Sequence, residues 1–296
     1  MKILLIGQSV EDHINFDRVE HPATPGGIFY SAAAISAIKE EKDEIFLATS
    51  IAENNYELFE WIYKDINLSY STFTAKIPKI HLTVKTGKER EECYNHLTDS
   101  LTIDTVNLSS FDAVYINMIT GFDISLQTLS DIRKNFIGII YIDIHSLARG
   151  LNDKMERHFI PIPNFSEWAK NVDIVQVNEN ELLTLSALKD EIEIVKEILA
   201  LGPSMLIVTY GEKGAALFYK EESEINRIFI KPQKIETVNQ VGCGDVLGAS
   251  FIYQYTKTKD KTDSLDFAVK TSGLVASYDS IKLIRNLKED VSRSIT

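Results

Sequence analysis

Short runs of apolar residues alternate with helical patterns along most of the chain. Several runs are rich in Ile and Val and apolar on both faces, which is typical of strands in a sheet covered by helices. These predicted strands are Ile3–Ile6, Ile45–Ala48, Ala113–Asn117, Ile139–Ile144, Asp173–Val177 and Met205–Thr209, and helices are predicted at 27–39, 53–64, 123–134, 179–200, 243–256 and 263–280. The order predicts an α/β fold with a doubly wound, mostly parallel sheet flanked by helices. Two later runs, Ala215–Tyr219 and Arg227–Ile230, indicate antiparallel strands at one sheet edge.

Two zones depart from this alternation. Residues 11–25 and 68–97 contain short strand patterns with polar flanks, such as Ser69–Thr74 and His81–Lys85, and no helical pattern lies between those strands. We predict that these zones form a small β-sheet lid. Because neither a linker nor an internal repeat divides the chain, the lid is expected to belong to a single domain that spans residues 1–296.

The composition argues against several classes of partner. Of the 296 residues, 44% are hydrophobic, which is enough for a buried core, and no apolar run approaches the length of a transmembrane helix. The net charge of −12 argues against nucleic acid or an anionic membrane, although a helix N-terminus binds phosphate without net basic charge. Cys93 and Cys243 are far apart and lack metal-binding spacing, so we expect a reducing, cytoplasmic location.

The segment Gly242-Cys243-Gly244-Asp245 stands at the start of a predicted helix. Glycines let backbone N–H groups approach an anion, and a helix N-terminus adds partial positive charge. Asp245 then lies close enough to accept a proton from a group that attacks the anion, as phosphoryl transfer to an alcohol requires. The alternative is a glycine turn with Asp245 as a helix cap. A dinucleotide fingerprint is disfavoured, because the polar residues 236–240 precede the glycines where an apolar strand should stand.

Two other segments place polar residues or glycines at strand ends. Thr209, Gly211 and Gly214 follow a predicted strand, and this pattern suits close approach to a nucleotide, although a strand-turn-strand would look similar. Asn178 and Glu181 lie three apart at a helix start, where their oxygens can hold Mg²⁺ directly or through waters. The alternative for that pair is a capping box.

The first part of the chain offers candidates for recognising a polyol. Asp12 follows the first strand and can accept hydrogen bonds from two hydroxyls, and Gly26 and Gly27 let backbone approach a substrate. Ordinary loop chemistry is the alternative for both. Further on, His145 is a candidate contact for substrate or phosphate, or else a satisfied structural group. Arg149 is either a phosphate clamp or a surface arginine.

Taken together and in this order, these segments resemble the ribokinase-like (PfkB-type) family of carbohydrate and nucleoside kinases over essentially the whole chain. The most specific part is Gly242-x-Gly244-Asp245, where the family usually has Gly-Ala-Gly-Asp. The resemblance implies that Asp245 is the catalytic base and that the anion hole is formed by the amides of Gly242, Cys243 and Gly244. It implies a nucleotide site at Thr209, Gly211, Gly214 and Asn178, and a Mg²⁺ site at Asn178 and Glu181. It further implies that the substrate is bound by Asp12, Gly26, Gly27, Ser31 and Asp143.

Two departures bear on what the resemblance implies. Asn239-Gln240-Val241 stands where the family has Asp-Thr-x, a segment associated with a monovalent cation, and Ser31 stands where an Asn commonly contacts a sugar. The expected function is ATP-dependent phosphorylation of a hydroxyl on a sugar or related polyol. A nucleoside or cyclitol kinase, or a catalytically idle ligand-binding or regulatory homologue, stays open. Phe73 and Leu82 in the lid zones further suggest a homodimer formed through the lid.

Overall fold

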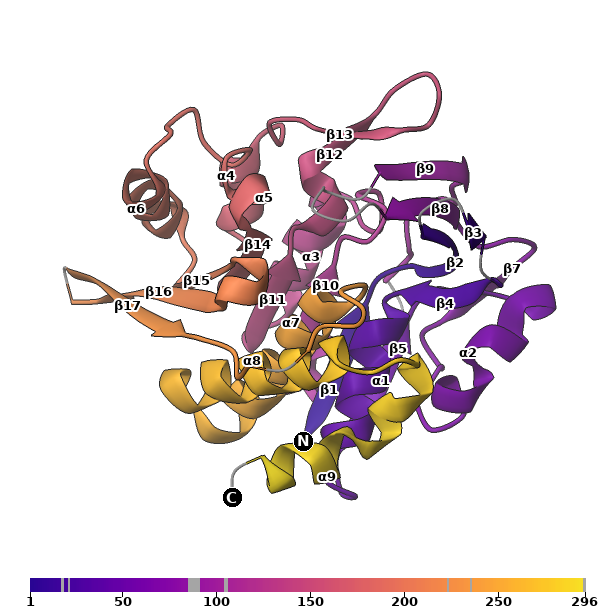
Figure 1. Ribbon diagram of the computed structural model, residues 1–296. Coiled ribbons are helices and arrows are strands. Elements are labelled where there is room, and N and C mark those ends of the chain that lie inside the picture. The colour runs from indigo at the N-terminus through magenta and orange to yellow at the C-terminus, as the bar shows by residue number, and fades with distance from the viewer. Residues whose placement is uncertain are drawn as a thin grey trace.

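A mostly parallel eight-stranded sheet runs through the centre of the computed structural model (Figure 1). The structure describes residues 1–16, 19–20, 22–84, 91–103, 106–222, 224–234 and 236–294. The strand order is β17-β16-β15-β14-β11-β10-β1-β5. The parallel strands are β5 (Glu44–Ala48), β1 (Lys2–Ile6), β10 (Ala113–Asn117), β11 (Ile139–Asp143), β14 (Ile174–Asn178) and β15 (Met205–Thr209), and the antiparallel edge is β16 (Ala215–Glu221) and β17 (Glu224–Ile230). The predicted fold class and the antiparallel edge are confirmed.

Both faces of this sheet are buried, which explains its continuous apolar strands. In β1, Ile3 and Leu5 belong to one core cluster, and Leu4 and Ile6 belong to the other. One face packs against α1 (Phe29–Ile38), α2 (Tyr56–Tyr63), α7 (Cys243–Thr258), α8 (Lys261–Ala276) and α9 (Leu287–Arg293), and the other against α3 (Leu126–Asn135), α4 (Phe165–Ala169), α5 (Glu179–Leu182) and α6 (Glu191–Leu201). The sheet is therefore doubly wound.

The single helix predicted at 179–200 is wrong. The structure ends α5 at Leu182 and begins α6 at Glu191. Between them the Ser186 hydroxyl accepts a hydrogen bond from the Leu188 amide at 3.0 Å, and Asp190 caps α6 through the Glu193 amide at 3.1 Å. Short polar side chains thus take up the backbone groups that a continuous helix would have paired.

A second, smaller sheet lies over the carboxyl end of the parallel strands (Figure 1). It consists of β2 (Ser9–Phe16), β3 (Val19–Glu20), β4 (Thr24–Gly27), β8 (Lys79–Val84) and β9 (Glu91–His96), and we call it the small sheet. Its order is β3-β2-β8-β9, with β4 paired to β2. Of the two zones expected to form the lid, residues 17–18, 21 and 85–90 lie outside the described part of the chain.

One strand expected in the lid lies elsewhere. Within the predicted strand Ser69–Thr74, only β7 (Thr72–Thr74) is a strand, and it pairs in parallel with β6 (Ser50–Ala52) in a separate two-stranded sheet. Phe73 on β7 is 63% exposed, whereas Leu82 on the small sheet is only 3% exposed. Leu82 is therefore covered within the chain and does not need a second subunit to bury it.

The outer edge of β9 is covered by the hairpin of β12 (Arg149–Leu151) and β13 (Arg157–Phe159). The Tyr94 amide donates a hydrogen bond to the Met155 carbonyl at 3.0 Å, and the backbones of Cys93 and Glu156 pair in an isolated antiparallel β-bridge. This contact joins the small sheet to the main domain on the side where Arg149 lies. Among the helices of the described residues, none combines the length and apolar character needed to cross a bilayer.

Candidate active site

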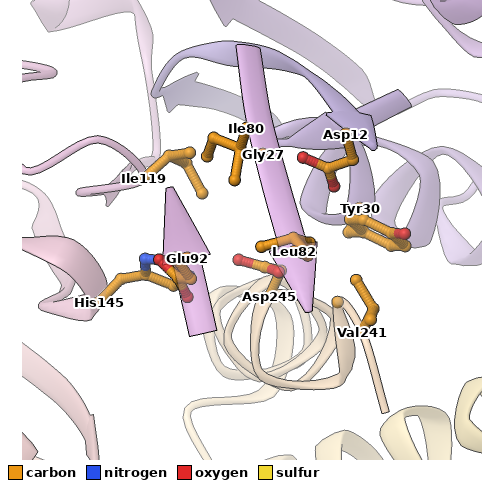
Figure 2. A pocket seen from close by; sticks show the side chains of 11 residues that line it. Asp12, Gly27, Tyr30, Ile80, Leu82, Glu92, Ile119, His145, Val241 and Asp245 are labelled. Atoms are coloured by element: carbon orange, nitrogen blue, oxygen red, sulfur yellow. The ribbon is translucent and has the colours of Figure 1, made fainter. Parts of the chain in front are cut away.

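A small cavity lies between the small sheet and the start of α7 (Figure 2). Its volume is about 30 Å³, which holds little more than a water molecule. The lining residues are Asp12, Gly27, Tyr30, Ile80, Leu82, Glu92, Ile119, His145, Val241, Gly242 and Asp245. The cavity in this structure is therefore smaller than a sugar molecule.

The start of α7 places Asp245 at this cavity. Gly242 is the N-cap residue with a φ of 80°, and Asp245 lies in the first turn, where it is 8% exposed. The Asn117 amide donates to Asp245 Oδ1 at 2.6 Å, and Asn117 itself is fully buried at the end of β10. Ser31 Oγ donates to the Asp245 carbonyl at 3.2 Å. Both the side chain and the backbone of Asp245 are thus fixed from neighbouring elements.

The backbone amides at this helix start are not all equally available. The Cys243 amide donates to the Gln240 carbonyl at 3.3 Å, whereas the helix geometry provides no internal acceptor for the next amide, that of Gly244. Burial, with a smaller contribution from the charge of Asp245, raises the pKa of the Cys243 thiol to about 12. The thiol therefore stays protonated at neutral pH, and this segment offers N–H groups rather than a thiolate nucleophile.

Gly242 is required by the geometry of this turn. A Cβ at this position would lie 2.2 Å from the Tyr30 ring, and its φ lies in the left-handed region. We expect Gly242→Ala to lower the free energy of unfolding by about 1–3 kcal/mol, measured by urea denaturation. The matched control is Gly273→Ala in α8, where an added Cβ meets no atom within 4 Å and helix propensity favours Ala by up to about 1 kcal/mol. Equal effects of the two variants would contradict the prediction.

Three residues expected at the substrate, Gly26, Ser31 and Asp143, are not among the residues that line the cavity. Ser31 is fully buried and contacts the backbone of Asp245, as described above. Asp143 is 3% exposed, and its Oδ2 accepts from Gln176 Nε2 at 2.7 Å. Gln176 Nε2 also donates to the Gly244 carbonyl at 3.1 Å, so Asp143 is linked to the start of α7 through Gln176.

The two glycines of β4 differ in their position relative to the cavity. A Cβ on Gly26 would lie 2.0 Å from Asp12 Oδ2, so the absence of a side chain there makes room for the Asp12 carboxylate. Gly27 lines the cavity itself and has a φ of 66°. Asp12, which is 4% exposed, points into the cavity from β2 (Figure 2).

The residues expected at a nucleotide lie together along the same sheet edge. Asn178 at the end of β14 pairs in register with Thr209 at the end of β15. Gly211 has a φ of 57°, and Gly214, with a φ of 117°, passes so close to β17 that a Cβ would lie 2.1 Å from the Ile230 carbonyl oxygen. Gln240 Nε2 donates to Glu212 Oε1 at 3.1 Å, which joins this turn to the segment before α7.

Asn178 and Glu181 form a capping box at the start of α5. Asn178 Oδ1 accepts from the Glu181 amide at 2.8 Å, and Glu181 Oε2 accepts from the Asn178 amide at 2.9 Å. Among the described residues, no group of three or more His, Cys, Asp or Glu has the arrangement of a metal site. The pair therefore does not fit an all-protein Mg²⁺ site. It fits the usual mode of Mg²⁺ binding, in which waters and donor phosphates supply most ligands and a carboxylate such as that of Glu181 completes the set.

Arg149 forms a buried ion-pair cluster rather than a surface contact. Its Nη1 lies 3.2 Å from Glu92 Oε1 on β9, and its Nη2 lies 3.6 Å from Glu181 Oε1 on α5. The exposed fractions of the Arg149, Glu92 and Glu181 side chains are 9%, 2% and 6%. The guanidinium also stacks over the Phe159 ring at 4.7 Å. One cation thus balances two buried carboxylates, one from the small sheet and one from the capping box.

Residues 55–283 match the pfkB family of carbohydrate kinases. The chain belongs to this family. It is 32% identical over 119 residues to a ribokinase from Arabidopsis thaliana, covering 38% of this chain and 30% of that protein. It is 29% identical over 91 residues to a cytidine kinase from Thermococcus kodakarensis, covering 31% and 32%. The chain thus aligns with about a third of the length of these curated relatives.

Solved structures share the fold of this pfkB-family chain over nearly its whole length. A pyrophosphate-dependent kinase in the ribokinase family superposes with a TM-score of 0.83 at 15% identity and covers 99% of both chains. A ribokinase from Thermotoga maritima superposes with a TM-score of 0.78 at 19% identity and covers 99% of this chain and 98% of that one. These likenesses show the ribokinase fold.

The buried Asp143 gives this pfkB-family chain a predicted pH dependence. Burial raises the pKa of Asp143 well above its ordinary value, and the charges of Glu181 and Asp245 raise it further. Because the folded protein then holds this proton more tightly than the unfolded chain does, stability falls as the pH rises above about 4, the ordinary carboxyl pKa. We expect Asp143→Asn, which keeps the acceptor for Gln176, to lessen this fall. Urea denaturation at a series of pH values measures it, and an unchanged slope would contradict the assignment.

Proposed function

We propose that the chain transfers the γ-phosphoryl group of ATP to a hydroxyl of a sugar or related polyol, with Asp245 as general base. The observation that carries this proposal is the position of Asp245, which lies in the first turn of α7 and faces the same cavity as Asp12. A base beside helix N-terminal amides is the arrangement that phosphoryl transfer to an alcohol needs. Family membership supports the same reaction class.

The proposed step begins with the acceptor hydroxyl against the Asp245 carboxylate. Asn117 holds Oδ1, so the second carboxylate oxygen takes the proton as the hydroxyl oxygen bonds to phosphorus and the bond to the leaving phosphate breaks. The N–H groups at the start of α7, that of Gly244 above all, stabilise charge on the phosphoryl oxygens. Mg²⁺, when bound with the donor, neutralises phosphate charge, and Glu181 is the residue we assign to it. Closure of the small sheet, acting as a lid, excludes water.

We assign the donor to the edge formed by Asn178, Thr209, Gly211 and Gly214. ATP is the first candidate, because the ribokinase fold includes an Arabidopsis thaliana ribokinase solved with ribose and ATP, at a TM-score of 0.72. Pyrophosphate is the second candidate. It is supported by the likeness to pyrophosphate-dependent kinases in the ribokinase family.

The test is a matrix of acceptors and donors. D-Ribose, myo-inositol and cytidine are each incubated with Mg²⁺ and either ATP or pyrophosphate, and phosphorylated product is measured by mass spectrometry. Product with D-ribose supports the proposal, and product with myo-inositol or cytidine supports the cyclitol or nucleoside alternative. The donor that yields the product identifies the phosphoryl source. Tight binding of an acceptor in calorimetry without any product in the matrix would favour an idle ligand-binding homologue.

The homodimer expected through the lid zones is also proposed, with Phe73 as the exposed apolar residue that a second copy would cover, although Phe73 lies on β7, outside the small sheet. Leu82 no longer supports it, because that side chain lines the cavity. A solution mass equal to one chain, measured by light scattering, would reject the dimer.

A further inference from the structure

Three buried polar residues lie in register where parallel strands of the main sheet end beneath α7. Asn117 on β10 pairs with Asp143 on β11, and Asp143 pairs with Gln176 on β14. Because residues in register on parallel strands point to the same face of a sheet, the three side chains form a row on the face that α7 covers. We call Asn117, Asp143 and Gln176 the strand-end row.

The strand-end row contacts the start of α7 at two chemically different groups. Gln176 Nε2 donates a hydrogen bond to the Gly244 carbonyl at 3.1 Å, and Asn117 Nδ2 donates one to Asp245 Oδ1 at 2.6 Å. From α1, Ser31 Oγ donates to the backbone carbonyl of Asp245 at 3.2 Å. Gln176 and Ser31 therefore hold the backbone at this point, whereas Asn117 holds the carboxylate that is proposed to accept the proton.

Asn117 is oriented for this carboxylate and not for its own hydrogen bonding. A carboxylate only accepts hydrogen bonds, so the amide nitrogen of Asn117 faces Asp245. In this orientation Asn117 Oδ1 is buried and has no hydrogen-bond partner among the described residues. A buried polar atom without a partner destabilises the folded state, whereas a hydrogen bond to a charged group is a strong one. The contact therefore stabilises the ionised form of Asp245, which is the form that a general base needs.

Resting on the proposed function, we propose that Asn117 is the positioning residue of the base: it holds Asp245 in one orientation and in its ionised form, so that the second carboxylate oxygen is ready for the acceptor hydroxyl. Asn117 is not among the described residues that line the cavity, so it acts through Asp245 and not on a ligand. Its loss should therefore lower kcat and move the pH dependence of the rate, while the donor and acceptor affinities stay nearly unchanged.

The test uses two changes at position 117, with whichever acceptor is turned over in the acceptor and donor matrix. Asn117→Leu keeps a similar shape and removes the donor. Because loss of a hydrogen bond to the charged form makes Asp245 easier to protonate, the acidic limb of the kcat/KM profile should move to higher pH by about one unit. At pH 7, kcat of this variant should fall at least about tenfold. Asn117→Asp should give a larger shift, because two adjacent carboxyl groups do not readily ionise together.

Ser31→Ala is the matched control, because it removes a hydrogen bond to the backbone of Asp245 and leaves the one to its carboxylate. It should not move the acidic limb. The other titratable groups that face Asp245 among the described residues are unchanged in all these variants, so each profile is compared with that of wild type. They are Asp12 and Glu92 from the small sheet, Tyr30 from α1, Tyr115 from β10, Asp143 from β11, His145 after β11, and Cys243 from α7.

Titration of aspartate carboxyl groups by carbon-13 NMR tests the inference without turnover. The signal that is absent from Asp245→Asn identifies Asp245, and its titration midpoint should move to higher pH in Asn117→Leu. An unmoved midpoint, or a fall in kcat with an unmoved acidic limb, would overturn the inference. Thermal unfolding shows whether each variant is folded, and Asn117→Asp carries the same test if Asn117→Leu is not. Absence of product with every acceptor would instead reject the proposed function, and the NMR titration would still decide whether Asn117 keeps Asp245 ionised.

Discussion

Replacement of Asp245 by asparagine is expected to lower kcat by about 10²–10⁴-fold and to leave donor binding nearly unchanged. The amide is isosteric with the carboxylate, and its oxygen can still accept the hydrogen bond that Asn117 donates at 2.6 Å. What the amide cannot do is accept the proton of the attacking hydroxyl. The change therefore removes one chemical step and retains the local geometry.

The measurement is a steady-state rate with the identified acceptor, combined with calorimetric titration of the donor. Asp263→Asn is a matched control, because Asp263 lies in the first turn of α8, an equivalent place in the neighbouring helix, but outside the cavity. It tests whether loss of a negative charge near a helix N-terminus is enough to lower the rate. Turnover of Asp245→Asn within about fivefold of wild type would reject the assignment of the base.

The main sheet was predictable because its strands are buried on both faces. Residues such as Ile3 to Ile6 then form unbroken apolar runs, which the sequence displays locally. The break between α5 and α6 was not predictable in the same way. Leu182 and Leu185 continue the apolar spacing past the end of α5, and both are buried in the same core cluster as α6. An apolar pattern therefore marks burial, and it does not show where the backbone stops being helical.

Some residues of the candidate site were predictable from the sequence and others were not. Asp245 directly follows Gly244 in the sequence, Asp12 follows the first predicted strand, and both line the cavity. Asn117 and Glu92 were missed, because each is a single polar residue whose partner is distant in the chain, 128 positions away for Asn117 with Asp245 and 57 for Glu92 with Arg149. Only the fold brings such pairs together. A polar residue ending a buried strand, as Asn117 does, is the signal that was available.

The buried position of Arg149 predicts the largest change in stability. Arg149→Met retains most of the side-chain volume but leaves the Glu92 and Glu181 carboxylates, 2% and 6% exposed, without the cation that now lies 3.2 and 3.6 Å away. Removing one partner of a buried ion pair costs about 3–5 kcal/mol, because the remaining charge is left uncompensated. Lys170→Met is the matched control, because the Lys170–Glu167 pair is 2.7 Å long but about half exposed, and such pairs contribute about 0–1 kcal/mol.

The double variant Arg149→Met with Glu92→Gln separates lost charge balance from lost packing. If uncompensated charge is the cause, Glu92→Gln removes one of the two buried carboxylates that Arg149→Met leaves without a cation. The double variant is then more stable than Arg149→Met alone, and its change in the free energy of unfolding departs from the sum of the two single changes by at least about 1 kcal/mol. If the lost stacking of the guanidinium on Phe159 is the cause, Glu92→Gln gives no recovery. Urea denaturation of the four proteins distinguishes these results. A value for Arg149→Met within about 1 kcal/mol of wild type would mean that the two carboxylates do not depend on this arginine, and that Glu92 is held at the cavity by other contacts.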